Sequence, residues 1–112
     1  MQIIENSSCH NHYDCLLNLC KQADELVIAS PFCFPNFETF VSYVSKKDSV
    51  RKITFITTMK NDEAVEKIDS LLSFRKAMKE HGIDWQMRID NMLHGKVYIF
   101  KNNDAPFAAI IT

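Results

Sequence analysis

Near the end of the chain, a histidine and a lysine stand two residues apart in the stretch Leu93-His94-Gly95-Lys96-Val97-Tyr98-Ile99-Phe100. The apolar residues predict a β-strand over residues 93–100, in which both side chains lie on one face, about 7 Å apart. A lysine there needs an anionic partner, because an unpaired ammonium among apolar groups is costly or has a depressed pKa. An imidazole nitrogen beside a fixed cation suits phosphoryl transfer, since the imidazole attacks phosphorus and the cation stabilises the phosphoryl oxygens. We therefore take His94 and Lys96 as candidate catalytic residues.

Two further residues are candidates for supporting roles around this pair. Asp90 would orient the ring of His94, although shaping the turn before it is the more ordinary role. Ser30 ends a predicted strand, and strand ends in open α/β sheets point toward the ligand crevice. It would contact phosphate there or only cap the turn. The ordinary interpretation of the pair also stays open, in which Lys96 extends to solvent and His94 is a satisfied turn residue.

The first half of the chain predicts two helices and two strands. A helix capped by Ser8 and ending near Asp24 would bury one face at helical spacing, namely Tyr13, Leu16, Leu17, Cys20 and Ala23. The apolar run 26–29, stopped by Ser30-Pro31, predicts a strand covered on both faces. A second helix would bury Phe37, Phe40, Val41 and Val44, and the β-branched run 53–57 predicts the next strand.

The second half predicts one long helix followed by strands. The helix would start at Asn61 as its N-cap and stop at Gly82, with the stripe Ala64, Val65, Ile68, Leu71, Leu72 and Phe74 or Met78 buried. Strands are predicted over 84–89, 93–100 and 106–111, and residues 102–105 are turn-forming, so the last two strands form an antiparallel hairpin. Trp85 is expected in the core, with stacking on a base as the alternative.

These elements predict one α/β domain over residues 1–112. Helical connections between the early strands require right-handed parallel crossovers. The fold class is therefore a mixed, mainly parallel β-sheet flanked by helices on both faces and ending in a β-hairpin. Because residues 108–112 end the chain within an apolar strand, we expect the domain to be an N-terminal fragment of a longer protein.

The His94-Gly95-Lys96 motif, with its apolar strand, short turn and second strand, resembles the phospholipase D superfamily. The resemblance is closest to its restriction-endonuclease and helicase-associated nuclease members, and covers most of the chain in element order. In that superfamily HxK is usually followed by an aspartate and, after the next strand, by GSxN. Here Lys101 stands at the aspartate position, as in nuclease-like branches that lack it. The chain ends before the serine and asparagine, with Thr112 at the position of the glycine.

The resemblance implies a phospholipase D-like half domain whose reaction needs no metal or cofactor. One histidine attacks phosphorus to form a phosphohistidine, a second protonates the leaving oxygen, and water releases the product. A single motif per chain implies a homodimer, or pairing with a second HxK motif. The function implied first is a restriction-type endonuclease acting on DNA. The alternatives are a phospholipid phosphodiesterase or transferase, and an inactive nucleic-acid-binding module of the same fold.

Composition sets wider bounds on this function. The formal charge of −1 is no signature of nucleic-acid binding, although residues 46–112 are mildly basic. No apolar run reaches the roughly 20 residues of a membrane span, and no signal peptide is evident, so a cytoplasmic protein with reduced thiols is expected. Four cysteines and two nearby histidines match no common zinc module, so no metal site is predicted; the cysteines are Cys9, Cys15, Cys20 and Cys33.

Overall fold

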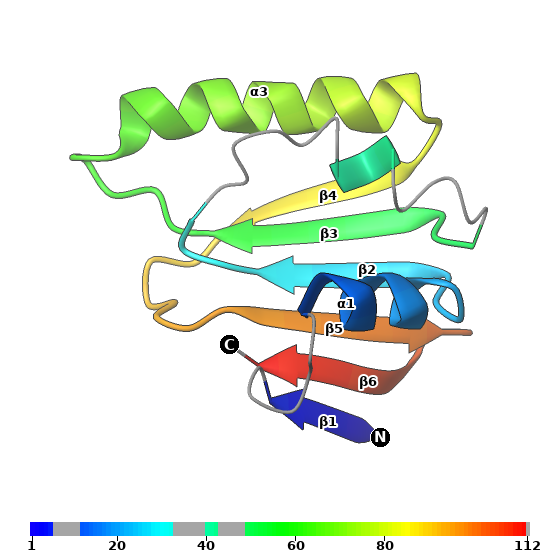
Figure 1. Ribbon diagram of the computed structural model, residues 1–112. Helices are drawn as coiled ribbons and strands as arrows, with labels where there is room; N and C mark the ends of the chain where they lie inside the picture. The colour runs from blue at the N-terminus through cyan, green and yellow to red at the C-terminus, as the bar shows by residue number, and fades with distance from the viewer. Residues whose placement is uncertain (6–11, 33–39, 43–48, 112) are drawn as a thin grey trace.

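The computed structural model describes residues 1–5, 12–32, 40–42 and 49–111 (Figure 1). The elements are, in chain order, β1 (Gln2–Glu5), α1 (His12–Cys20), β2 (Glu25–Ala29), β3 (Lys52–Thr57), α3 (Ala64–Glu80), β4 (Asp84–Ile89), β5 (Val97–Asn102) and β6 (Ala105–Ile111). A helical segment over residues 40–42 lies between β2 and β3. The predicted cap Ser8 and the helix-face residues Phe37 and Val44 lie outside the described residues.

All six strands form one sheet in the order β1-β6-β5-β2-β3-β4. The pairs β2–β3, β3–β4 and β1–β6 are parallel, whereas β5 runs antiparallel to both of its neighbours, β2 and β6. The helix α3 connects β3 to its parallel neighbour β4, as a parallel pair requires. The predicted α/β class, the mixed and mainly parallel sheet and the C-terminal hairpin are confirmed.

The hairpin between β5 and β6 turns at Asn103 and Asp104. Both residues have positive φ, at 52° and 64°. Two successive positive φ values are the mark of a type I′ turn, whose twist matches that of the flanking strands. Asparagine and aspartate adopt this conformation more readily than other non-glycine residues, which is why the predicted turn over 102–105 is confirmed.

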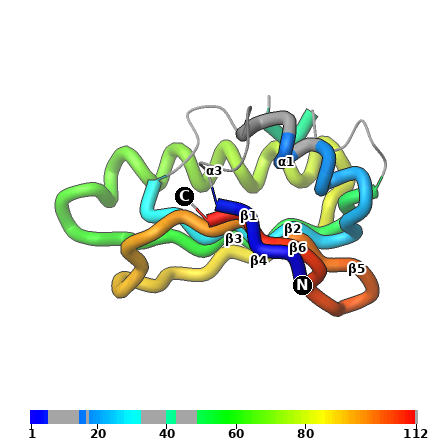
Figure 2. The backbone as a smooth tube through the Cα atoms, turned by 60° about the horizontal axis from the view of Figure 1, so that its bottom comes forward, coloured from blue at the N-terminus to red at the C-terminus, as the bar shows by residue number. Residues whose placement is uncertain are grey.

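One face of the sheet carries the hydrophobic core. Alternate residues of the central strands are fully buried and are joined by side chains of both helices; the cluster includes Leu16, Leu19, Leu26, Ile28, Ile53, Phe55, Phe74, Met78, Tyr98, Phe100, Ala108 and Ile110. Figure 2 shows α1 and α3 on this same side. The other residues of β2 and β5 are half-buried or, at Asn102, exposed. The described helices thus cover one face, whereas the sequence predicted helices on both.

The helix α3 differs from its prediction in its start and in its buried stripe. Its N-cap residue is Glu63 rather than Asn61. Its last residue is Glu80 and its C-cap is His81, and Gly82, with φ of 64°, takes the predicted left-handed position that stops the helix. The buried residues are Lys67, Phe74, Ala77 and Met78, whereas Val65, Ile68 and Leu72 are exposed. The C-terminal half packs on the sheet through Phe74, whose ring centroid lies 5.7 Å from that of Phe55 and 6.3 Å from that of Trp85.

Three further expectations need correction. The strand β5 starts at Val97, so His94 and Lys96 lie in the segment that leads into the strand rather than within it. The short edge strand β1 was not predicted, because its four residues show too little pattern; it exists through parallel pairing with β6. The expectation of reduced thiols is wrong for Cys15, which is disulfide-bonded, while Cys20 is free and buried.

Candidate active site at the carboxyl edge of the sheet

The sheet brings the candidate residues to a single edge. The strands β2, β3 and β4 are parallel and in register, so their carboxyl ends lie side by side. The antiparallel strand β5 begins at this same edge, beside the end of β2. The connection from β4 to β5, which carries Asp90, His94 and Lys96, therefore passes the end of the strand that precedes Ser30, at the left of Figure 1. We call this the carboxyl edge.

Lys96 and Tyr98 form the part of the site that reaches the core. Lys96 is half-buried, and its Nζ lies 5.5 Å from the centroid of the Tyr98 ring. Burial lowers the pKa of Lys96 below its usual 10.5 and raises the pKa of the Tyr98 phenol to about 12. The ring stays neutral at physiological pH, and its face is a favourable place for the ammonium. Lys96 is thus a cation held at the rim of the core.

His94 is exposed at the same edge. An exposed imidazole two residues before a half-buried ammonium can reach a substrate that the ammonium also contacts. The two side chains do not share a regular strand, and their proximity in space stays a prediction.

Ser30 lies next to Lys96 across the sheet. Ala29 pairs with Val97 in the antiparallel register and with Ile56 in the parallel one, so one position further Ser30 stands between Lys96 and Thr57. Ser30 is 1% exposed, and its Oγ donates to the carbonyl of Phe32 and accepts from the Phe32 amide, at 2.8 and 3.1 Å. The hydroxyl therefore closes the turn after β2, which is the more ordinary of its two predicted roles.

Thr57 ends β3 in this same row and was not singled out from the sequence. Its side chain is fully buried. Its Oγ1 has no hydrogen-bond partner among the described residues. A buried hydroxyl left without a partner costs about 1–3 kcal/mol, and such groups concentrate at functional sites. No sequence signal distinguishes Thr57 from Thr54, the other threonine of this strand.

Asp90 shapes the turn that precedes His94. Its Oδ1 accepts from the Met92 amide at 3.0 Å, and its carbonyl accepts from the Leu93 amide at 3.2 Å. Its own amide donates to the carbonyl of Thr57 at 2.8 Å. The carboxylate is thus bonded within its own turn, the ordinary role considered for it, rather than to the His94 ring.

A buried lysine cluster that the sequence analysis missed lies on the core side of this edge. Lys67 is 6% exposed, and its Nζ donates to the carbonyl of Thr58 at 2.7 Å and to its Oγ1 at 2.5 Å. The same Nζ lies 3.1 Å from Glu63 Oε1. Hydrogen bonds from Thr58 and the Lys60 amide, then from Lys67, lower the pKa of Glu63 to about 2. The i, i+4 spacing of Glu63 and Lys67 was the available signal, but it suggested an exposed pair.

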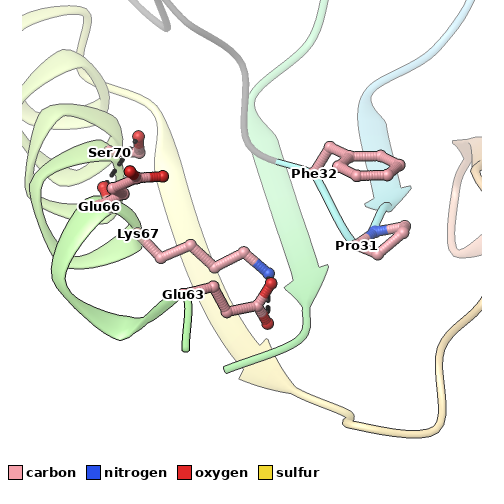
Figure 3. A pocket seen from close by; sticks show the side chains of 6 residues that line it. All are labelled: Pro31, Phe32, Glu63, Glu66, Lys67 and Ser70. Atoms are coloured by element: carbon pink, nitrogen blue, oxygen red, sulfur yellow. Dashed lines mark hydrogen bonds and ion pairs between the residues drawn. The ribbon is translucent and has the colours of Figure 1, made fainter. Parts of the chain in front are cut away.

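The cluster forms one wall of a pocket of about 240 Å³. Its lining residues come from the start of α3 and from the turn after β2: Pro31, Phe32, Glu63, Glu66, Lys67 and Ser70. Figure 3 shows the Lys67 and Glu63 side chains meeting on one side, with the rings of Pro31 and Phe32 on the other. The pocket adjoins the carboxyl edge, because Ser30 is bonded directly to Phe32.

Two residues discussed from the sequence lie away from the site. Trp85 is paired with Ile53 near the amino end of β4 and packs edge-on against Phe74. It is nevertheless 36% exposed and lies outside the buried core, so the expected core role is wrong. Lys101, at the position of the superfamily's aspartate, pairs with Glu25 across the strands, with 3.6 Å between Nζ and Oε1. It lies five residues beyond Lys96, about 16 Å along the strand direction. This departure from the motif is thus remote from the candidate site.

Two surveys cover only the described part of the chain. In it, no three His, Cys, Asp or Glu side chains gather where they could hold a metal ion. None of its helices has the length and apolar character needed to cross a membrane.

The comparisons with known proteins agree with this geometry. No curated protein matches the chain. A family model, described as the NgoFVII restriction endonuclease N-terminal PLD domain, matches residues 10–112, which include every candidate residue named above. The suspected relation to phospholipase D-like restriction endonucleases is confirmed, and the chain belongs to the family of NgoFVII restriction endonuclease N-terminal PLD domains.

Proposed function

We propose that this protein is a metal-independent DNA endonuclease in which His94 forms a phosphohistidine and Lys96 stabilises the phosphoryl oxygens. The observation that carries the proposal is the arrangement at the carboxyl edge, where the exposed imidazole precedes a half-buried ammonium. Membership of a restriction-endonuclease family favours DNA as the substrate. We place the protein in the cytoplasm, where such a substrate is found.

The reaction proceeds in two displacements. A nitrogen of the neutral His94 ring attacks phosphorus, the N–P bond forms, and the bond from phosphorus to the leaving sugar oxygen breaks. A second histidine, protonated, gives its proton to that oxygen. The same histidine then takes a proton from water, whose oxygen attacks phosphorus and breaks the N–P bond. The Lys96 ammonium stabilises the charge that develops on the non-bridging oxygens in both steps.

The second histidine is His94 of a second copy of the chain, which is related to the first by a twofold axis at the carboxyl edge. Apolar side chains are exposed around this edge: Phe32 is 75% exposed, Met92 78% and Ile89 51%. Large exposed apolar side chains near a site favour a protein interface. A second copy docked there would bury these side chains and bring the two imidazoles to one phosphate. Asp90 and Ser30 support the site by shaping the turns that flank it.

Residues 1–112 by themselves are expected to be inactive, so the test is cleavage of plasmid DNA by the full-length protein in excess EDTA, with wild type and His94→Ala side by side. We expect wild type to cleave and His94→Ala to lose about three orders of magnitude or more, which is the scale for a lost nucleophile. Quenching in alkaline denaturant, in which the acid-labile N–P bond survives, followed by detection of the histidine–DNA adduct should label wild type only. His81→Ala, at the end of α3, is the matched histidine control and should cleave normally.

Three results would count against the proposal. Wild type that is inactive without added metal contradicts the metal-independent route. A His94→Ala variant that cleaves at a comparable rate contradicts the nucleophile. Wild type that binds DNA but leaves it intact under both conditions supports the alternative of an inactive binding module.

A further inference from the structure

The turn that carries His94 has little hydrophobic packing to hold it. Asp90, Asn91, Met92 and His94 are exposed, and Leu93 is half-buried. A turn with few buried apolar contacts opens easily unless hydrogen bonds restrain it. Catalysis by an imidazole needs the opposite, because a displacement of about 1 Å costs about 100-fold in rate. The bonds that restrain this turn therefore matter for its chemistry.

Two hydrogen bonds tie the turn to the end of β3. The Asp90 amide donates to the carbonyl of Thr57 at 2.8 Å. The Asn91 Oδ1 accepts from the Met59 amide at 2.7 Å. The first continues the ladder between the parallel strands β3 and β4, so it belongs to the sheet. The second bond depends on the side chain of Asn91, and it joins the His94 turn to the segment after β3.

The Met59 amide is held rigidly from both sides. On one side, the Lys67 ammonium binds both the carbonyl and the hydroxyl of Thr58. On the other, the Lys60 amide donates to Glu63 Oε1 at 2.9 Å. Glu63 also accepts from the Thr58 hydroxyl at 2.6 Å and pairs with Lys67. We call Thr58, Glu63 and Lys67 the bracket.

The bracket uses its charges internally. The Lys67 Nζ has three donors and three acceptors around it, so its full hydrogen-bonding capacity is used. Burial of an ammonium is costly unless it is paired in this way. Such a group is poorly suited to bind substrate. Its effect is to fix the backbone that precedes α3, and with it the amide that Asn91 contacts.

We propose that Asn91 is a positioning residue for His94, and that the bracket of Thr58, Glu63 and Lys67 fixes the backbone amide on which Asn91 anchors the turn. This inference rests on the proposed role of His94. Asn91 needs only an acceptor oxygen for this task, since the bond described for its side chain is the one accepted from Met59. An aspartate would supply that acceptor and an alanine would not.

The experiment compares Asn91→Ala, Asn91→Asp and a matched control in the full protein. The control is Asn102→Ala, which removes another exposed asparagine bond to the backbone, from Nδ2 to the carbonyl of Gln22 at 2.6 Å. Asn102 ends β5 at the opposite edge of the sheet, so its loss should affect stability and not the site. We expect Asn91→Ala to lower kcat about 10- to 100-fold with KM changed less than about twofold.

Asn91→Asp should keep kcat within about threefold of wild type, because the carboxylate accepts the same amide. Its KM should rise, since the added negative charge repels DNA phosphates. Lys67→Met removes the bracket and should lower kcat in the same direction. If Lys67→Met does not fold, the three asparagine variants carry the test by themselves.

A readout independent of turnover separates this proposal from the proposed function. The His94 ring signals are followed by NMR while inorganic phosphate is added to wild type and each variant. Wild type, Asn91→Asp and Asn102→Ala should show the same phosphate-dependent shifts, and Asn91→Ala should show broadened signals with a weaker response. A normal response together with absent cleavage in wild type would refute the function while leaving the positioning role intact.

The positioning role is overturned by any of three results. One is an Asn91→Ala variant with kcat within twofold of wild type. Another is an Asn91→Asp variant whose kcat falls as far as that of Asn91→Ala. The third is an Asn102→Ala control that lowers kcat equally, since that would show general destabilisation and not positioning.

Discussion

Polar groups are bonded differently at the two edges of the sheet, the carboxyl edge and the opposite edge where β2, β3 and β4 begin, which we call the amino edge. At the amino edge, polar side chains cross-link the chain: Glu25 pairs with Lys101, the Asn102 side chain binds the carbonyl of Gln22, and the Asn103 amide binds Asp24. At the carboxyl edge, a hydroxyl is buried without a hydrogen-bond partner at Thr57, and burial depresses the pKa of an ammonium at Lys96.

This difference shows that the amino edge stabilises the fold, whereas the carboxyl edge contains groups that reduce its stability. Cross-links between neighbouring strands hold the amino edge together and offer nothing to a ligand. The carboxyl edge retains a buried hydroxyl without a hydrogen-bond partner among the described residues, and an ammonium whose pKa is lowered by burial. Local violations of good packing and pairing are expected at functional sites, where other parts of the structure compensate for them. The bracket behind Asn91 is such a compensating part.

The largest expected difference between the two edges is in DNA cleavage after removal of one lysine from each. Lys96→Ala should lower DNA cleavage about 100-fold or more, because it removes a charge that stabilises the transition state. Lys101→Ala should leave cleavage within about twofold and cost at most about 1 kcal/mol of unfolding free energy, since an ion pair with partly exposed groups contributes little. Steady-state kinetics and urea denaturation measure the two effects. Equal cleavage by both variants would remove the distinction between the edges.

The pH dependence of cleavage should report the buried state of Lys96. Burial lowers its pKa below 10.5, so the protonated form that binds phosphate is lost as pH rises through this lowered value. Cleavage should therefore decline at a pH below that at which a free lysine titrates. Lys96→Arg keeps its charge and should move the decline to higher pH, with lower absolute activity because its geometry differs. Identical alkaline profiles for the two proteins would exclude Lys96 as the titrating group.

The bracket should make stability depend on pH through Glu63. In the folded protein its pKa is about 2, well below the 4.5 that is usual for an unpaired glutamate. A pKa that is lower when folded contributes stability that is complete above 4.5 and is lost as pH falls toward 2. Glu63→Gln should thus be less stable than wild type at pH 7, and the difference should shrink between pH 4.5 and 2. Thermal unfolding at several pH values tests this.

Glu66→Gln is the control for this experiment, because its carboxylate lines the same pocket and is exposed. Its stability relative to wild type should stay nearly constant over the same range. A Glu63→Gln difference that does not change with pH would show that the charge of Glu63 contributes nothing to the bracket.

The smallest expected effect is at Thr57. Valine has nearly the same shape as threonine and lacks the hydroxyl, so Thr57→Val removes a buried group without a partner. We expect it to stabilise the protein by about 1 kcal/mol, within the range for an unsatisfied buried polar group. Chemical denaturation measures this, and a loss of stability would mean that the hydroxyl is bonded in solution. A simultaneous loss of phosphate binding would show that Thr57 serves the row beside Lys96.

Local patterns were sufficient for much of the fold and for the centre of the candidate site. The apolar runs predicted the strands around residues 26–29, 53–57 and 84–89, because strand formation there follows from side-chain type. Asn103 and Asp104 predicted the hairpin through their tolerance of positive φ. His94 and Lys96 were singled out because an HxK motif leads into an apolar strand, and their catalytic role stays a prediction. Each of these signals lies within a few adjacent residues.

Only the tertiary structure decided which residues meet at the site. Register across three strands places Thr57 and Ser30 beside Lys96, and no local pattern encodes register between strands so far apart in sequence. The same holds for Asn91, whose partner lies 32 residues away, and for Lys67, whose ammonium is buried against Thr58 and Glu63. Val65 and Leu72 follow the helical period but lie on a different face of α3 from the buried Lys67, Phe74 and Met78. Composition and spacing determine which segments form helices and strands; burial, partners and charge at each position depend on what folding brings against them.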